Sequence, residues 1–115
     1  MKFSEYIQYD GLGLAQLVKN KEVHASELLR IALERTDKTN SKLNAVIIPM
    51  YEQAKQRTQQ QSSGLFAGVP FLVKDLFQEY QGVHTSYGSN ALKKINYTPD
   101  FNAEIVNRWE KTGII

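Results

Sequence analysis

GVPFLVKD, residues 68–75, is the stretch that decides how this sequence is interpreted. Residues 69–73 carry no polar side chain. A continuous apolar run of this length is typical of a strand covered on both faces, as in an α/β sheet, rather than of a surface strand with alternating polarity. Pro70 lies near the start of the run, where a missing ladder donor is tolerated. The stretch therefore predicts a buried strand that ends in Lys74 and Asp75.

Lys74 lies at the carboxyl end of this predicted strand, where open α/β sheets usually place their ligands. Alternation along a strand puts its side chain on the face opposite to Asp75. The pattern leaves two interpretations open: the ammonium group extends past the strand into water, or it lies partly buried beside reactive groups. A partly buried ammonium loses its proton more easily, and a neutral amine can act as a base. Lys74 is therefore the first candidate catalytic residue.

The composition is that of one small globular domain. The chain has 115 residues, 42% of them hydrophobic and 23% charged, with a formal net charge of +2 that gives no reason to expect a nucleic-acid or acidic partner. It contains no cysteine, which excludes disulfides, thiolate metal ligands and cysteine nucleophiles. No apolar run is long enough to cross a membrane, and the first residues lack a signal core. We expect no membrane association and a cytoplasmic location.

Hydrophobic periodicity predicts several helices before the strand. Residues 14–18 have the spacing of one helix face, and residues 25–36 carry a longer stripe on a helix that Asn40 and Ser41 are expected to end. A polar helix is expected over residues 51–61. After the strand, residues 78–98 read as a long irregular segment, and such segments are often functional.

The last part of the sequence predicts a helix followed by a strand. Asn102 is placed to act as the N-cap, residues 105–109 supply an inward face with Ile105, Val106 and Trp109, and Gly113 ends the helix. Ile114 and Ile115 then resemble the first residues of a second buried strand. The expected fold class is α/β, with amino-terminal helices packed on part of a mixed β-sheet.

Taken in order, these motifs resemble those of the amidase signature family. A glycine-proline strand runs into Val73-Lys74-Asp75, a glycine follows at Gly82, and Thr-x-x-Gly-Ser is present at residues 85–89. A helix beginning near Asn102-Ala103 then leads to Thr112-Gly113-Ile114-Ile115. The earlier segments Leu14-Ala15-Gln16-Leu17-Val18 and Leu43-Asn44-Ala45 also fit, so the resemblance covers nearly the whole chain.

The resemblance implies a hydrolase of carboxylic amides with a Ser–cis-Ser–Lys triad, whose lysine matches Lys74. It also implies that Gly88 and Ser89 shape the substrate-binding loop, that a small-molecule amide is the substrate, and that no cofactor or metal is needed. Residues 1–115 would be the amino-terminal portion of a single, incomplete α/β/α domain. The family's two catalytic serines lie in a Gly-Gly-Ser-Ser-Gly-Gly region beyond residue 115. Ser62-Ser63-Gly64 resembles that region superficially but precedes Lys74 in the sequence. The chain alone is therefore expected to be inactive.

Two other classes of function compete with the amidase. The first is a non-enzymatic domain that self-associates, or pairs with another chain such as the remainder of the enzyme, because an unfinished sheet exposes strand edges. The second is a metal site, for which His24 and His84 are the only histidines and lie far apart. Nucleic-acid binding is supported only by Lys93-Lys94, and the tyrosines are scattered along the chain.

Overall fold

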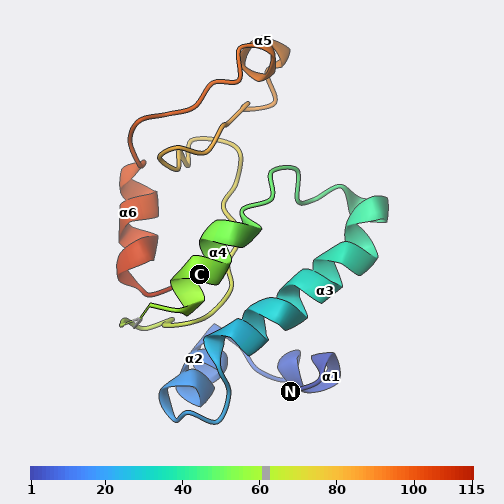
Figure 1. The fold of residues 1–115 in the computed structure, drawn as a ribbon, viewed down its shortest axis with the longest axis vertical. Helices are drawn as coiled ribbons and strands as arrows, with labels where there is room; N and C mark the ends of the chain where they lie inside the picture. Colours follow the sequence, from blue (N-terminus) through green and yellow to red (C-terminus); the bar gives the residue numbers. More distant parts are fainter. Residues whose placement is uncertain (61–62) are drawn as a thin grey trace. The chain divides into compact units, whose positions relative to one another are not determined.

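The computed structural model describes residues 1–60 and 63–115. In that part of the chain it has six helices (Figure 1). Contacts divide the chain into two compact units. The helical unit comprises residues 1–71 and 112–115, and the loop unit comprises residues 72–111. The helices of the helical unit are α1 (Phe3–Tyr6), α2 (Gly11–Lys19), α3 (Ala25–Leu43) and α4 (Tyr51–Thr58), and those of the loop unit are α5 (Asn90–Lys94) and α6 (Glu104–Lys111).

A small apolar core holds the helical unit together. Leu14 of α2, Leu28 of α3, and Val23 and Val69 from the segments beside these helices are all buried. Leu28 is fully buried, and burying a leucine side chain contributes about 2 kcal/mol. The stripes predicted for α2 and α3 are therefore confirmed as core faces.

The termini of the first two long helices follow from local hydrogen bonds. Asp10 caps α2, because its Oδ1 accepts from the backbone N–H of Gly13 at 2.8 Å. Helix α3 runs to Leu43, beyond the predicted end at Asn40. The side chain of Asn40 both accepts from the N–H of Val46 and donates to its carbonyl, each at 2.9 Å, so it fixes the chain that leaves the helix.

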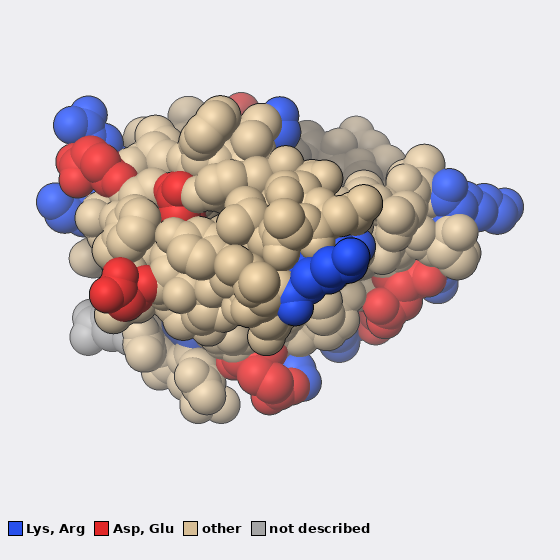
Figure 2. Space-filling model, turned by 90° about the horizontal axis from the view of Figure 1, so that it is seen from above, with Lys and Arg blue, Asp and Glu red and all other residues tan. Residues whose placement is uncertain are grey.

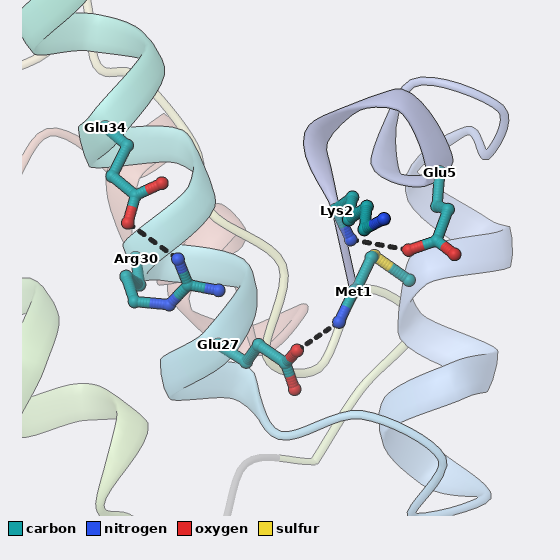
Figure 3. A network of polar contacts seen from close by, with 6 residues as sticks. All are labelled: Met1, Lys2, Glu5, Glu27, Arg30 and Glu34. Carbon is teal, nitrogen blue, oxygen red and sulfur yellow. Dashed lines mark hydrogen bonds and ion pairs between the residues drawn. The ribbon is translucent and has the colours of Figure 1, made fainter.

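Polar contacts tie the first residues of the chain to α3. The amino group of Met1 donates to Glu27 Oε1, and one helical turn further on Arg30 Nη1 lies 2.6 Å from Glu34 Oε1 (Figure 3). The hydrogen bond from the terminal ammonium lowers the pKa of the Glu27 carboxyl. The Arg30–Glu34 pair is largely exposed to solvent and so adds little to stability, whereas the Met1–Glu27 pair is partly buried.

The predicted β-sheet is wrong. The described residues form no strand, although residues 68–71 exchange backbone hydrogen bonds with residues 113–115. Gly68 N–H donates to the Gly113 carbonyl at 2.9 Å, and Ile115 donates to the Val69 carbonyl at 2.9 Å and accepts from the Phe71 N–H at 2.8 Å.

The pairing in this structure reaches Phe71, which bonds Ile115, the last of the 115 residues, and the residues after Phe71 make other contacts. The N–H of Lys74 donates to the side chain of Gln78 at 2.6 Å instead of to a neighbouring strand, and Phe77 has a left-handed backbone with φ of 56°. A ladder needs regularly extended residues with free donors. The apolar run is thus neither helix nor strand, and the expected α/β class is replaced by a helical one for the residues described.

The loop unit is held together by polar side chains as well as by helix α6. Asn102 does not cap α6, which begins at Glu104. Its Oδ1 instead accepts from the backbone N–H of Gln81 at 2.7 Å, and Tyr80 donates its hydroxyl to Glu110 Oε1 at 2.7 Å. These bonds fasten the long loop to α6.

The predicted inward face of α6 is only partly confirmed. Val106 is buried and Trp109 is half-buried, but Ile105 is 40% exposed. Among the described residues of the loop unit, the buried apolar side chains are Val106 and Pro99. A unit with so little apolar burial depends more on its hydrogen bonds than the helical unit does.

Candidate functional site

Lys74, the predicted catalytic base, lies in the loop unit on backbone that is neither helix nor strand. Its side chain is exposed. The residues before it, Phe71 and Leu72, are 47% and 68% exposed. The described residues therefore do not bury the lysine, and they do not cover the apolar run on both faces as the sequence predicted.

Asp75, the next residue, is the centre of a polar cluster. Its Oδ1 accepts from the Thr85 hydroxyl and from the backbone N–H of Ser86, the latter at 2.9 Å. Its Oδ2 accepts from the Ser86 hydroxyl at 2.6 Å. We call Asp75, Thr85 and Ser86 the aspartate lock, because these bonds close the loop between them.

The two residues that donate hydrogen bonds within the lock are buried. Thr85 and Ser86 are each 7% exposed. Burial by itself raises the pKa of the Asp75 carboxyl, but hydrogen bonds from Ser86 and Thr85, with a smaller contribution from the nearby His84, outweigh it and hold the pKa below its usual value. The carboxylate is therefore the stable form, and its hydrogen bonds are of the stronger, charge-assisted kind.

The lock continues to Gly88, one of the two predicted substrate-binding residues. The Ser86 hydroxyl that donates to Asp75 also accepts from the backbone N–H of Gly88 at 3.3 Å. Gly88 is exposed and has a φ of 71°, and a Cβ at this position would meet nothing within 4 Å. Its glycine is thus explained by backbone conformation and not by close packing.

Ser89, the second predicted binding residue, has a structural contact in this molecule. Its Oγ accepts from the backbone N–H of Leu92 at 3.5 Å, so it caps helix α5. Its own N–H donates to the Ser86 carbonyl at 2.7 Å. The structure thus brings Asp75, Ser86, Gly88 and Ser89 into one connected loop, and the roles of Lys74, Gly88 and Ser89 stay predictions.

Sequence reasoning missed the role of Asp75. Strand alternation placed it on the face away from Lys74, and nothing more was inferred from it. The available signal was an aspartate followed further along the chain by Thr85-Ser86, since hydroxyl side chains readily bond a carboxylate. That signal is weak, because the spacing alone does not show that the loop closes.

The alternative metal site is not formed by the residues that the structure describes. His24 and His84 are both exposed, and residues 1–60 and 63–115 contain no group of three or more His, Asp or Glu side chains placed to hold a metal ion. Ser62, part of the Ser-Ser-Gly echo, lies outside the described residues.

The surface charges are mixed in sign. On the face drawn in Figure 2, Lys and Arg side chains and Asp and Glu side chains occur in small separate groups among uncharged residues. This distribution accords with the formal net charge of +2. Of the helices described, none has both the length and the apolar character needed to cross a membrane.

Relatives of known identity match most of the chain. It is 36% identical over 106 residues to the 6-aminohexanoate-cyclic-dimer hydrolase of Paenarthrobacter ureafaciens, a match that covers 92% of this chain and 21% of the relative. It is 38% identical over 92 residues to the lipoamidase of Enterococcus faecalis, covering 78% of this chain and 13% of the relative. A component of the glutamyl-tRNA(Gln) amidotransferase of Bdellovibrio bacteriovorus is 33% identical over 110 residues, or 89% and 22% of the two chains.

The solved structures agree with the sequence matches. The structure of 6-aminohexanoate cyclic dimer hydrolase complexed with substrate matches 93% of this chain and 22% of its own, with a TM-score of 0.87 and 34% sequence identity. The chain thus spans about one fifth of the length of the 6-aminohexanoate-cyclic-dimer hydrolases it matches. The Amidase family matches residues 27–115, and the chain belongs to that family.

Proposed function

We propose that these residues form the amino-terminal part of a single amidase domain that hydrolyses the C–N bond of carboxylic amides. Membership of the Amidase family, over residues 27–115, is the observation that carries this proposal. The names of two relatives, a cyclic-dimer hydrolase and a lipoamidase, support it. The two catalytic serines belong, in this proposal, to polypeptide outside the 115 residues.

In this proposal Lys74 is the general base of a Ser–cis-Ser–Lys triad. The neutral amine of Lys74 takes the proton that the nucleophilic serine passes on through the cis-serine. The serine oxygen then attacks the amide carbonyl, and the protonated Lys74 returns its proton through the cis-serine to the leaving amine. Water, deprotonated by the same base, hydrolyses the acyl-enzyme and regenerates the serine. Only a neutral amine can act as the base, and burial favours that form. The exposed Lys74 must therefore be covered when the serines are brought to it.

Gly88 and Ser89 are proposed to form one wall of the substrate site. The aspartate lock and the cap of α5 hold their backbone in place. A small-molecule amide is the expected substrate, with backbone N–H groups near the serines stabilising the oxyanion. The relatives act on chemically different substrates by name, so the leaving amine is not assigned.

Activity measurements on two forms of the protein test the proposal. The purified 115-residue chain is expected to show no turnover of a simple amide. A polypeptide that also carries the serine region is expected to hydrolyse it and to lose at least about a thousandfold in kcat in the Lys74→Ala variant. Lys93→Ala is the matched control, because Lys93 is an exposed lysine of the same unit.

Two outcomes would contradict the proposal. The first is turnover by the 115-residue chain itself that Lys74→Ala abolishes, because the chain would then have a nucleophile of its own. The second is full activity of the longer polypeptide after Lys74→Ala. The intact mass of the protein from its source cells shows which of the two forms is the natural one, since the chain has a mass of 13.1 kDa.

A non-enzymatic, self-associating domain is the second candidate. Leu65, Phe71 and Leu72 favour it, because they are 66%, 47% and 68% exposed and exposed apolar side chains promote association. Light scattering on the purified chain tests it: a monodisperse dimer is expected, and a monomer at high concentration would rule it out.

A further inference from the structure

The residue that follows the proposed base is an acid, and this creates a chemical difficulty. A carboxylate close to a lysine amine favours the protonated form, which cannot accept a proton. Asp75 is ionised in its usual state, and it is the immediate neighbour of Lys74 in the chain. An enzyme that uses Lys74 as a base therefore needs a way to keep the Asp75 carboxylate directed elsewhere.

The structure contains such an arrangement. Both oxygens of Asp75 are engaged by Thr85 and Ser86, through two hydroxyl groups and one backbone N–H. The donors are 7% exposed, so water competes poorly for these bonds. Three donors to one carboxylate fix its orientation and satisfy much of its hydrogen-bonding capacity.

The donors are themselves fixed to the rest of the loop unit. Thr85 N–H donates to the Tyr97 carbonyl at 2.9 Å, and Gly82 N–H donates to the Pro99 carbonyl at 2.9 Å. Backbone hydrogen bonds of Thr85, and of Gly82 in the same loop, therefore hold the donors of the lock in place. Asp75 is thus bonded to residues that are themselves fixed.

One charged neighbour of the lock acts in the same direction. His84, adjacent to Thr85 in the chain, favours the ionised form of Asp75. Glu79 accepts a hydrogen bond from the hydroxyl of Tyr87, within the same loop. Neither His84 nor Glu79 takes the place of the lock donors, so Thr85 and Ser86 are the groups that direct the Asp75 carboxylate.

We propose that Asp75 is a positioning residue, which Thr85 and Ser86 hold in one orientation so that Lys74 is correctly placed and does not pair with its neighbouring acid. The same hydrogen bonds reach Gly88 through the Ser86 hydroxyl, so the lock links the proposed base to the proposed substrate wall. This inference rests on the proposed function, since it assigns a partner to the base of that reaction.

Paired substitutions at Thr85 test the inference in the amidase polypeptide that carries the serine region. Thr85→Val keeps the size of the buried side chain and removes the hydroxyl donor, whereas Thr85→Ser keeps the donor. Thr98→Val is the matched control, because Thr98 is an exposed threonine of the same unit. Turnover of a simple amide is measured as kcat and KM across pH, with thermal melts to confirm folding.

Thr85→Val is expected to lower kcat by about 10- to 100-fold, as misplacement of a catalytic group does. With one of its three donors removed, the Asp75 carboxylate is held less firmly and favours protonated Lys74 more, so the pH at which kcat/KM reaches half its maximum is expected to rise. Thr85→Ser is expected to stay within about threefold of the wild type, with an unchanged midpoint, because the donor is kept. Ser86→Ala removes the other hydroxyl donor and leaves the Thr85 hydroxyl and the Ser86 N–H in place, so it is expected to shift the midpoint in the same direction.

The outcomes separate this inference from the proposed function. If Lys74→Ala abolishes activity while Thr85→Val keeps the wild-type kcat and pH midpoint, the positioning role is wrong and the proposed base stands. If Lys74→Ala leaves activity intact, both fail. A fall in kcat with an unchanged midpoint and a lowered melting temperature shows that Thr85 only stabilises the fold, which also overturns the inference. If Thr85→Val does not fold, Ser86→Ala is judged by the same criteria.

Discussion

The two units of this protein are stabilised in different ways. In the helical unit, helices α2 and α3 bury apolar side chains in a common core that includes Leu28 and Val69. In the loop unit, the buried residues are Val106, Thr85, Ser86 and Pro99, and hydrogen bonds connect the loop to itself and to α6. Apolar burial is stabilising and tolerant of position, whereas buried hydrogen bonds are directional. The chain thus places the proposed catalytic residues on the part whose geometry depends on hydrogen bonds.

The largest effect is expected in the core of the helical unit. Leu28→Ala removes a fully buried side chain and is expected to lower the free energy of unfolding by about 2–5 kcal/mol. Leu43→Ala, at a residue of the same helix that is 68% exposed, is expected to change it by less than about 0.5 kcal/mol. Urea denaturation measures both. Equal losses would show that Leu28 is not part of the stabilising core.

The next effect concerns backbone space at Gly113. Its φ is 82°, and a Cβ there would lie 2.6 Å from the Ser63 carbonyl oxygen and 2.8 Å from the Ala67 Cα. Gly113→Ala is expected to lower the free energy of unfolding by about 1–3 kcal/mol or more, because steric clash adds to backbone strain.

Gly82→Ala is the control that isolates strain from clash. Gly82 also has a left-handed φ, of 75°, but a Cβ there would meet nothing within 4 Å. Gly82→Ala is expected to lower the free energy of unfolding by about 1 kcal/mol. If the two variants unfold at the same urea concentration, the close approach at Gly113 has no energetic consequence.

A smaller and more local effect is expected when the lock is opened. Asp75→Ala removes the acceptor of the Ser86 N–H and is expected to speed hydrogen exchange of that amide by about tenfold, the equivalent of one buried hydrogen bond. The amide of Leu28, in the other unit, is the internal reference and should exchange as in the wild type. A uniform change at both amides would mean that the two units are not independently stabilised.

The smallest effect is the pH dependence of the same contact. Hydrogen bonds from Ser86 and Thr85 hold the folded pKa of Asp75 below its usual value despite burial. A depressed folded pKa stabilises the folded state above the unfolded pKa, about 3.9, and that stability is lost as the pH falls through the folded value. Ser86 exchange is therefore expected to accelerate only below about pH 4. Asp75→Asn, which does not ionise, should lack this acid-dependent step. Persistence of the step in that variant would assign it to another carboxyl group.

Much of the helical unit could be predicted from the sequence. The stripe over residues 25–36 identified α3 and its buried face, because a period of about 3.6 residues is a local property. The prediction that Ile105 faces inward is wrong, since this residue is 40% exposed, and it rested on the same local pattern. Periodicity finds a helix face but not its full extent, since what packs on that face comes from elsewhere in the chain.

The sequence by itself determined the positions of the long helices, the glycine that follows α6 and the membership of a family through an ordered set of motifs. Only the tertiary structure decided that residues 69–73 are not a covered strand and that Asp75 bonds to Thr85 and Ser86. The physical reason is the range of the interactions. Helical periodicity depends only on residues that are close in the sequence. The covering of an apolar run and the closing of a loop depend on groups that the local pattern does not specify.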